Sequence, residues 1–157
     1  MSFQFSCRIQ TEDFSISAEY EAVRKDSCGA LVLFSGLVRD QFDHQDGPLQ
    51  ALELEHYPGM TENAIASIAE RAAARFDLRA ITVIHRVGRL GCGEQIVLVT
   101  VTAPHRSDAF AACEMLMDFL KNQVPIWKKA HFAQATEWVE AKSSDKEALN
   151  RWGKVTG

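Results

Sequence analysis

A proline ends a strongly apolar helical pattern in this chain, and a lysine stands on either side of it. The segment reads Leu120-Lys121-Asn122-Gln123-Val124-Pro125-Ile126-Trp127-Lys128-Lys129. Proline cannot continue a helix and disfavours helical geometry at the residue before it, so Val124 should be extended. We therefore expect the chain to turn sharply here and to carry Lys128 back toward Lys121.

These two lysines are candidate catalytic residues. A lysine takes part in chemistry when its ammonium is partly desolvated or lies beside other cations, because either setting lowers its pKa from about 10.4 toward neutrality. The alternative is that both are solvated cations, favoured at a helix end by the helix dipole and by neighbours such as Asp118. The residue types alone leave both interpretations open.

The length and composition fit one globular domain over residues 1–157. With 46% hydrophobic and 24% charged residues, the chain does not have a disordered, collagen-like or coiled-coil composition. No apolar run approaches the roughly twenty residues of a membrane helix, and the first residues alternate like a strand instead of forming a signal peptide. The net charge of −4 argues against nonspecific nucleic-acid binding. We expect a cytoplasmic protein without membrane or nucleic-acid partners.

The cysteines predict neither a metal site nor a redox pair. The four residues are widely separated and form no Cys-x-x-Cys motif: Cys7, Cys28, Cys92 and Cys113. Cys92 lies between two glycines in an expected exposed turn, where we interpret it as a turn residue and not as a nucleophile. We predict no bound metal and no resident cofactor.

Patterns with strand and helix periods follow one another along the chain. Strands are predicted from alternation or from β-branched runs at residues 3–9, 30–38, 52–57, 81–87, 95–102 and 136–141. The run 30–38 should be buried, and the glycine-rich segment 88–94 should be a hairpin connection. The segment 40–48 is polar and rich in turn residues, so we expect a mobile loop there.

Helical periods mark the remaining segments. A helix should begin at Thr61 as its N-cap, and its apolar stripe would contain Ile65, Ile68, Ala69, Ala72 and Phe76. A second should begin near Ser107 and bury Phe110, Cys113, Met117 and Leu120, and a last one should span 144–152. Helices separated by groups of strands favour an α+β domain with a mainly antiparallel sheet and packed helices.

Cationic residues follow the expected strand ends. Arg39 closes one strand, and His105-Arg106 lies between another strand and the second long helix. Because a helix N-terminus offers backbone donors to an anion, these residues could converge with Lys121 and Lys128 on a phosphate. The sequence alone does not establish that they meet.

Other catalytic patterns are absent from the sequence. There is no Gly-x-Ser-x-Gly, no His-Glu-x-x-His and no glycine-rich phosphate loop. His85 shares a strand face with Ile81 and Val83, which indicates a buried histidine more than a ligand. What remains is a cation-rich anion pocket with lysines that can act as acid, base or nucleophile.

A set of short segments resembles the large, catalytic subunit of molybdopterin synthase. They occur in order and at family-like spacing over about residues 29–152: 34–39, 54–60, 83–88, 103–107, 117–121, 125–128 and 138–141. The resemblance implies an α/β-hammerhead domain that forms a homodimer within a heterotetramer and binds one small ubiquitin-like sulfur carrier per subunit. The carrier's C-terminal thiocarboxylate would donate sulfur to cyclic pyranopterin monophosphate. Two transfers would form the molybdopterin dithiolene in molybdenum cofactor biosynthesis.

The resemblance also implies site residues. Lys121 and Lys128 would be catalytic, serving proton transfer and ring opening. The implied substrate-binding residues are Leu37, Val38, Arg39, His105, Arg106, Lys121, Lys128, Lys129 and Ala130. Two positions depart from the family pattern. Ala130 stands where an acidic residue is common, and Lys142 stands where an arginine is common, although lysine cannot bind an anion bidentately.

Two other functions are also compatible with the sequence. A noncatalytic module that docks a ubiquitin-like partner is consistent with Ala130. A Schiff-base enzyme that uses Lys121 on a carbonyl substrate is a role that desolvated lysines perform. The sequence does not decide which lysine is the nucleophile or the order of the two sulfur transfers.

Overall fold

Two four-stranded sheets organise the chain in this computed structural model, which describes residues 3–40, 44–140 and 143–153. The first sheet has the order β1 (Gln4–Gln10), β4 (Ala80–Arg86), β6 (Gln95–Ala103), β2 (Ala30–Leu37). The second has the order β5 (Gly88–Leu90), β3 (Leu49–His56), β7 (Ile126–Phe132), β8 (Thr136–Val139). In the described part of the chain, β1 and β4 run parallel and the other neighbouring strands run antiparallel.

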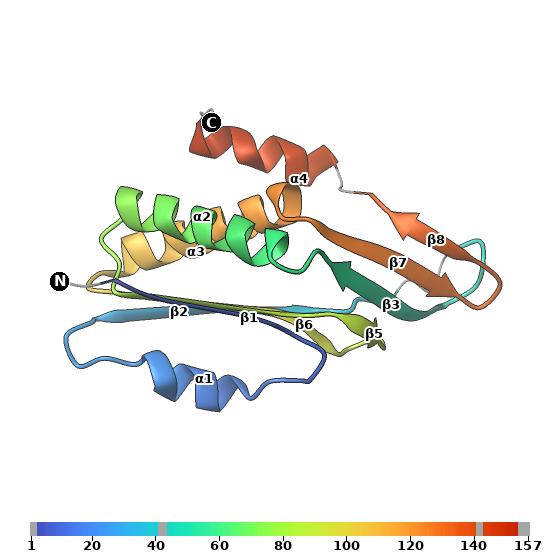
Figure 1. The fold of residues 1–157 in the computed structure, drawn as a ribbon, viewed down its shortest axis with the longest axis horizontal. Helices are drawn as coiled ribbons and strands as arrows, with labels where there is room; N and C mark the ends of the chain where they lie inside the picture. Colours follow the sequence, from blue (N-terminus) through green and yellow to red (C-terminus); the bar gives the residue numbers. More distant parts are fainter. Residues whose placement is uncertain (1–2, 41–43, 141–142, 154–157) are drawn as a thin grey trace.

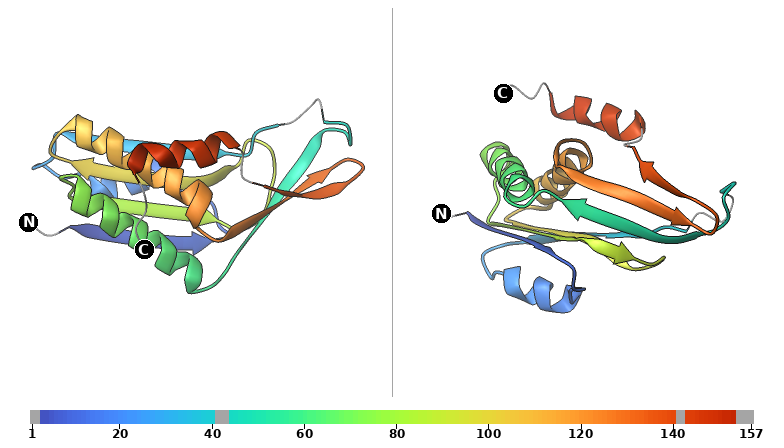
Figure 2. Two further views of the ribbon diagram at one scale, coloured as in Figure 1. Left: turned by 90° about the horizontal axis from the view of Figure 1, so that it is seen from above. Right: turned by 45° about the vertical axis from the view of Figure 1, so that its right-hand side comes forward.

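The helices cover both faces of the first sheet (Figure 1). α2 (Met60–Arg75) and α3 (Arg106–Gln123) lie on one face, and α1 (Ile16–Val23) lies on the other. α4 (Ser143–Ala148) and the 3₁₀ turn Leu149–Trp152 follow β8 and pack against α3. Figure 2 shows the second sheet projecting sideways from the block formed by the first sheet and the helices. The predicted α+β class with a mainly antiparallel sheet and packed helices is confirmed.

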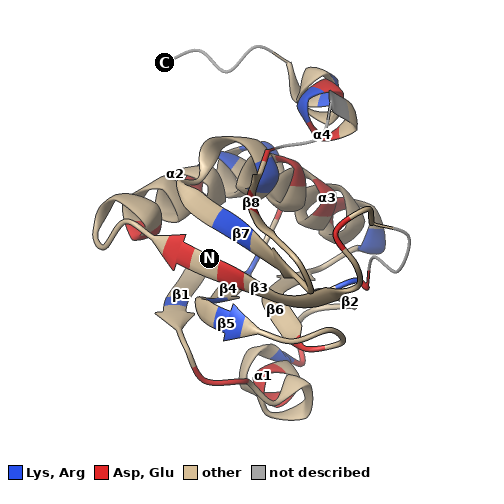
Figure 3. Cartoon of the chain, turned by 90° about the vertical axis from the view of Figure 1, so that its right-hand side faces the viewer, with Lys and Arg blue, Asp and Glu red and all other residues tan. Residues whose placement is uncertain are grey.

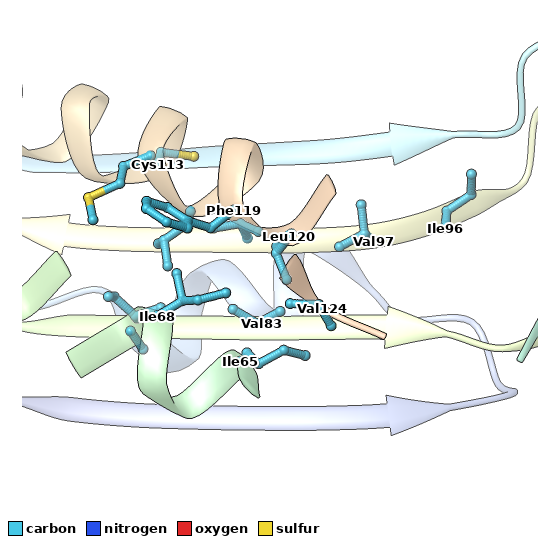
Figure 4. Packing of buried hydrophobic residues seen from close by; sticks show 14 of the residues in the cluster. Ile65, Ile68, Val83, Ile96, Val97, Cys113, Phe119, Leu120 and Val124 are labelled. Atoms are coloured by element: carbon cyan, nitrogen blue, oxygen red, sulfur yellow. The ribbon is translucent and has the colours of Figure 1, made fainter. Parts of the chain in front are cut away.

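The main core fills the space between the first sheet and the pair α2–α3 (Figure 4). The predicted stripe of α2 is confirmed for Ile65, Ile68, Ala69 and Ala72, which are buried. Phe76, the last predicted member, is instead the half-buried C-cap residue at the edge of the core. The prediction for α3 is partly wrong: Phe110 is 62% exposed, whereas Phe119 is 2% exposed. α3 packs against the sheet and against α2 at once, so its buried face is wider than a single apolar stripe and is centred elsewhere.

β2 is an edge strand, and this corrects the expectation that residues 30–38 are buried. Its described hydrogen-bonded neighbour is β6 alone, and most of its side chains are half-buried. Phe34 is 40% exposed and Leu37 is 55% exposed, whereas Val38 just beyond the strand is buried. An edge strand has one open side, so an apolar run does not guarantee burial.

The segment 88–94 is more than a hairpin connection. Gly88, with φ of 93°, lets the backbone leave the first sheet, and Gly88–Leu90 forms β5 of the second sheet instead. The turn that follows exposes Cys92, as predicted, and its thiol donates to the carbonyl of Leu49 at 3.3 Å. Residues 41–43 of the predicted mobile loop lie outside the described residues, and its mobility stays a prediction.

The junction between α3 and β7 has the predicted form. α3 ends at Gln123, and Val124 is extended with φ of −95° and ψ of 127°. The fully buried Thr61 hydroxyl donates to the carbonyl of Pro125 at 2.9 Å and accepts from the amide of Tyr57 at 2.9 Å. Thr61 is therefore not the N-cap of α2, which is Gly59. Its hydroxyl instead joins the start of α2 to the end of α3.

We expect Thr61→Val to lower the free energy of unfolding by about 1 to 2 kcal/mol, because the similar volume would leave a partly buried amide and a partly buried carbonyl without their partner. Thr61→Ser keeps the hydroxyl and should cost clearly less. Urea unfolding of the two variants measures the difference. Equal losses would show that the methyl group matters and the hydrogen bonds do not.

Candidate active site

Two adjoining cavities open beside the junction of α3 and β7. The outer one, called the lysine pocket here, has a volume of about 420 Å³ and includes Arg39, Lys121 and Lys128 in its lining. The inner one, called the inner chamber, has a volume of about 280 Å³ and is lined mostly by apolar side chains. The two share part of their lining: Leu37, Ile96, Lys121, Val124, Ile126 and Lys128. Both lysines therefore stand where the cavities meet.

The backbone explains how two lysines seven residues apart reach one site. Lys121 lies in the last turn of α3, and Lys128 lies on β7 after the proline turn. Lys128 pairs with Leu54 of β3 and Val139 of β8, so it points to the face of the second sheet that lines the pocket. Lys128 is half-buried, as expected for a desolvated lysine, but Lys121 is exposed in the single chain.

Strand alternation separates Lys129 from its neighbour. Successive side chains point to opposite faces, and Lys129 lies opposite Glu53 and Trp138, with its ammonium 5.4 Å from the Trp138 ring centroid. Figure 3 shows the mixed charges of this sheet, with blue on β7 and β5 and red on β3. Lys129 belongs to neither cavity lining, although the resemblance made it a substrate contact.

Two more implied substrate contacts lie outside the linings. Val38 is 2% exposed and packs in the core, while its backbone is bonded to Gly93 and Glu94. Ala130 is buried opposite Glu137, which lies on the same sheet face. Ala130 replaces the acidic residue that is common in the family at this position, and the neighbouring strand β8 supplies the carboxylate of Glu137 beside it. Lys142, the other departure, lies outside the described residues.

His105 and Arg106 are not brought to the pocket within one chain. His105 is the exposed N-cap of α3 and Arg106 is its first residue, whereas Lys121 is in the last turn. At about 1.5 Å per residue, the helix separates Arg106 from Lys121 by roughly 22 Å. The structure thus brings together Leu37, Arg39, Lys121 and Lys128 and leaves the two α3 N-terminal residues apart.

Sequence reasoning missed acidic and apolar residues of the site. Glu140 and Asp145 line the lysine pocket together with its cations, and Phe34 and Met117 line the inner chamber. Phe34 was assigned to a buried strand and Met117 to the core, because periodicity describes which side of an element is apolar but not where two elements leave a gap. The exposure of Phe34 follows from the position of β2 at the edge of the sheet, which the sequence pattern does not reveal.

His85 lies in the inner chamber as a buried, neutral group. Burial is the main cause that lowers its pKa from 6.5 to about 4, and the charges of Lys128 and then Lys121 act in the same direction. The sequence-based interpretation of a buried histidine is confirmed, with 7% exposure. It also faces the two lysines, which the periodicity did not indicate.

Three thiols, those of Cys7, Cys92 and Cys113, favour the protonated form. Burial raises the pKa of Cys7 and of Cys113 to about 11, and desolvation also raises the pKa of Cys92. A protonated thiol is a poor nucleophile. The interpretation of Cys92 as a turn residue therefore stands, and the reactive candidates of the site are its lysines.

One group of described residues has the composition of a metal site. His44, Asp46 and Glu137 place ligand atoms within 4.8 Å of one another. Both ring nitrogens of His44 already have protein partners, because Nδ1 accepts from the amide of Asp46 at 3.2 Å and Nε2 lies 3.2 Å from Glu137. The ring also stacks on Phe132 at 3.6 Å. We interpret the group as polar contacts that connect the segment before β3 to the β7–β8 hairpin.

The fold and the site define an α+β protein in which two lysines and an arginine line one pocket. The MoaE protein family model matches residues 9–123, and the chain belongs to this family. The matched region contains Lys121 but ends before Lys128.

Relatives and solved structures extend the likeness beyond that region. The molybdopterin synthase catalytic subunit of Ralstonia nicotianae is 50% identical over 151 residues, which cover 95% of this chain and 85% of that protein. The MoaE protein structure from Burkholderia ambifaria has a TM-score of 0.81 and 46% identity, covering 97% of this chain and all of the other. A Helicobacter pylori structure of the complex of subunits 1 and 2 of molybdopterin-converting factor shares the fold, with a TM-score of 0.70 and 18% identity over 88% of this chain and 92% of that one.

These likenesses confirm the predicted family, the α/β-hammerhead-type architecture and the function as a molybdopterin synthase catalytic subunit, a sulfurtransferase of molybdenum cofactor biosynthesis. No helix among the described residues is long and apolar enough to cross a membrane.

The lowered pKa of His85 predicts an acid-sensitive contribution to stability. Between pH 6.5 and about 4 the unfolded chain takes up a proton at His85 that the folded protein refuses, so stability falls as pH falls through this window. The loss from neutral pH to pH 4 should reach roughly 3 kcal/mol, and His85→Gln should remove this part of the slope. Urea unfolding across the window measures it, with the exposed His105→Gln as control. Equal slopes for the wild type and His85→Gln would contradict the prediction.

Proposed function

We propose that this chain transfers sulfur from the C-terminal thiocarboxylate of a small ubiquitin-like carrier to cyclic pyranopterin monophosphate, and that two such transfers form the molybdopterin dithiolene. The observation that carries the proposal is the convergence of Lys121 and Lys128, from a helix end and a strand, on the same two cavities. Arg39 adds a third cation to the outer cavity. This set suits a phosphate-bearing substrate and supplies groups for proton transfer.

The carrier's tail suits the lysine pocket. A glycine-ended peptide has no side chains to exclude it from a narrow site, and its terminal anion would meet Arg39 and the lysines. The sulfur would then arrive on the partner, which agrees with the raised pKa values of the Cys7 and Cys113 thiols. The two-subunit complex described for the Helicobacter pylori protein supports a small partner subunit.

A homodimer would bring His105 and Arg106 to the site. The open edge of β2 can pair antiparallel with β2 of a second copy around a two-fold axis. β2 runs from Ala30, which pairs with Ala103 near the start of α3, to Leu37 at the pocket. The antiparallel pairing would place the second copy's Ala30 end, with its His105 and Arg106, beside Leu37. It would also cover the exposed Phe34 and shield Lys121 from water.

The decisive experiment is to incubate the purified chain with thiocarboxylated carrier and cyclic pyranopterin monophosphate and to detect the dithiolene product by mass spectrometry. Product formation separates the proposal from a noncatalytic binding module. Borohydride trapping of a lysine adduct with small carbonyl compounds, without dithiolene formation, would favour the Schiff-base alternative. A carrier that lacks its last two glycines should dock weakly and give no product.

Lys121→Ala should lower turnover by a factor of about one hundred or more, the range for removing a positioned acid–base group, with carrier binding nearly unchanged. Lys121→Arg keeps the charge but cannot release a proton near neutral pH, so it should fail almost as badly. Lys128→Ala should also be severely impaired. Lys146→Ala removes an exposed cation of α4 that lines neither cavity and is the matched control. Near-normal turnover of Lys121→Arg would reduce Lys121 to an anion contact.

Mixing two inactive variants tests the shared site. If the second copy supplies Arg106, dimers that exchange between Arg106→Ala and Lys121→Ala will contain heterodimers with one intact site. Random exchange makes half of the dimers mixed with one of two sites intact, so about a quarter of wild-type activity should return. No recovery after verified exchange would contradict the proposed dimer.

A further inference from the structure

His85 continues the core-facing side of β4 into the inner chamber. Side chains alternate along a strand, so His85 follows Val83, which Figure 4 shows in the core between Ile65 of α2 and Val124. Of the described residues that line this chamber, Ser35 and His85 carry the uncharged side-chain oxygen and nitrogen atoms. The Ser35 hydroxyl is directed to Gln95 at 3.4 Å. The imidazole is therefore the neutral group best placed to meet the lysines.

One hydrogen bond fixes which ring nitrogen carries the hydrogen. Nδ1 of His85 lies 2.8 Å from the carbonyl oxygen of Arg86. A carbonyl oxygen can only accept, so Nδ1 donates, and Nε2 of the neutral ring is left unprotonated. Arg86 is itself held by bonds to the carbonyls of Thr11 at 3.0 Å and Gln95 at 3.1 Å. The ring is thus anchored on a rigid part of the first sheet.

The surroundings of the ring keep it neutral. The charged groups that act on it come from three elements: Lys128 on β7, Lys121 on α3 and His56 on β3. His56 lies 3.5 Å from Glu62, which partly offsets its charge when it is protonated. A protonated His85 would be a further cation beside two ammonium groups, whereas the neutral ring offers them a lone pair. Both lysines line the chamber with His85, and Lys128 is the half-buried one of the two, so we take it as the partner.

We propose that His85 is a positioning residue of the site: its unprotonated Nε2 accepts a hydrogen bond from the Lys128 ammonium and holds that group where the two cavities meet. A lysine has a flexible four-carbon stem with three donors, so an acceptor on a rigid strand selects one of many side-chain positions. Because the ring is neutral, it positions the ammonium without adding a negative charge that would repel an anionic ligand. The expected effect on turnover rests on the proposed function, but the proposed hydrogen bond between His85 and Lys128 does not.

Two substitutions separate this role from packing. Gln places its amide oxygen near the position of Nε2 and loses the bond to Arg86, whereas Asn keeps a donor near Nδ1 and loses the acceptor in the chamber. We expect His85→Gln to stay within about threefold of wild-type turnover and His85→Asn to lose about tenfold or more in kcat with little change in carrier binding, the size of a hydrogen bond to a charged group. The reverse order would show that the bond to Arg86 matters and would overturn the proposal.

A second readout needs no activity and therefore stands apart from the proposed function. Acetylation of lysines by a limiting amine reagent, quantified by peptide mass spectrometry, reports how free Lys128 is. In His85→Asn, Lys128 should react about tenfold faster than in the wild type, because its ammonium is both released and less stabilised, while Lys146 should be unchanged. Equal rates at Lys128 would overturn the proposal even if dithiolene forms.

A measurement on the unsubstituted ring covers the case in which His85→Asn does not fold. Nitrogen NMR of the wild-type protein should show an unprotonated Nε2 at neutral pH. Its resonance should move when Lys128→Met removes the donor and should stay nearly unchanged in Lys146→Met. A protonated Nε2, or the same resonance in both variants, would overturn the proposal.

Discussion

The turn at Pro125 is the constraint on which the site depends. Proline ends α3 at Gln123, Val124 is extended, and β7 begins at Ile126, so the chain passes from the helical layer to the second sheet within two residues. The hydroxyl of Thr61 binds the carbonyl of Pro125 and so fastens this turn to the start of α2. One lysine therefore lies on each side of this short turn, and the two cavities open beside the turn.

Much of the framework could be predicted from residue patterns. The proline stop, the stripe of α2 and the glycine turn around Cys92 follow from local chemistry that acts within a few residues. The pairing of Lys121 with Lys128 at one site was anticipated from the turn and from the family resemblance. Local signals succeed here because each of these features is decided by the residue itself and its immediate neighbours.

The rest depends on contacts between distant segments. Whether Phe110 is buried depends on how α3 sits between the sheet and α2, and whether β2 is an edge depends on strand order. Thr61 is a residue type that favours the N-cap position, yet its hydroxyl donates a hydrogen bond to a carbonyl 64 residues away. His105 and Arg106 have the right chemistry for the pocket, but the length of α3 keeps them from it in one chain. Neither hydrophobic periodicity nor a short sequence motif predicts these contacts between distant segments.

The alternation of β7 has a consequence for how such a sequence can diverge. Lys128 and Lys129 occupy opposite faces of one strand, so the identity of the residue in the pocket is set by counting from Pro125. Insertion or deletion of one residue in this stretch would exchange the two lysines and turn Trp127 or Ala130 inward or outward with them. Changes of length are therefore tolerable only in pairs, whereas point substitutions on the outer face are open to drift. The strand register therefore constrains the number of residues between Pro125 and Lys128 more tightly than it constrains the identity of each one.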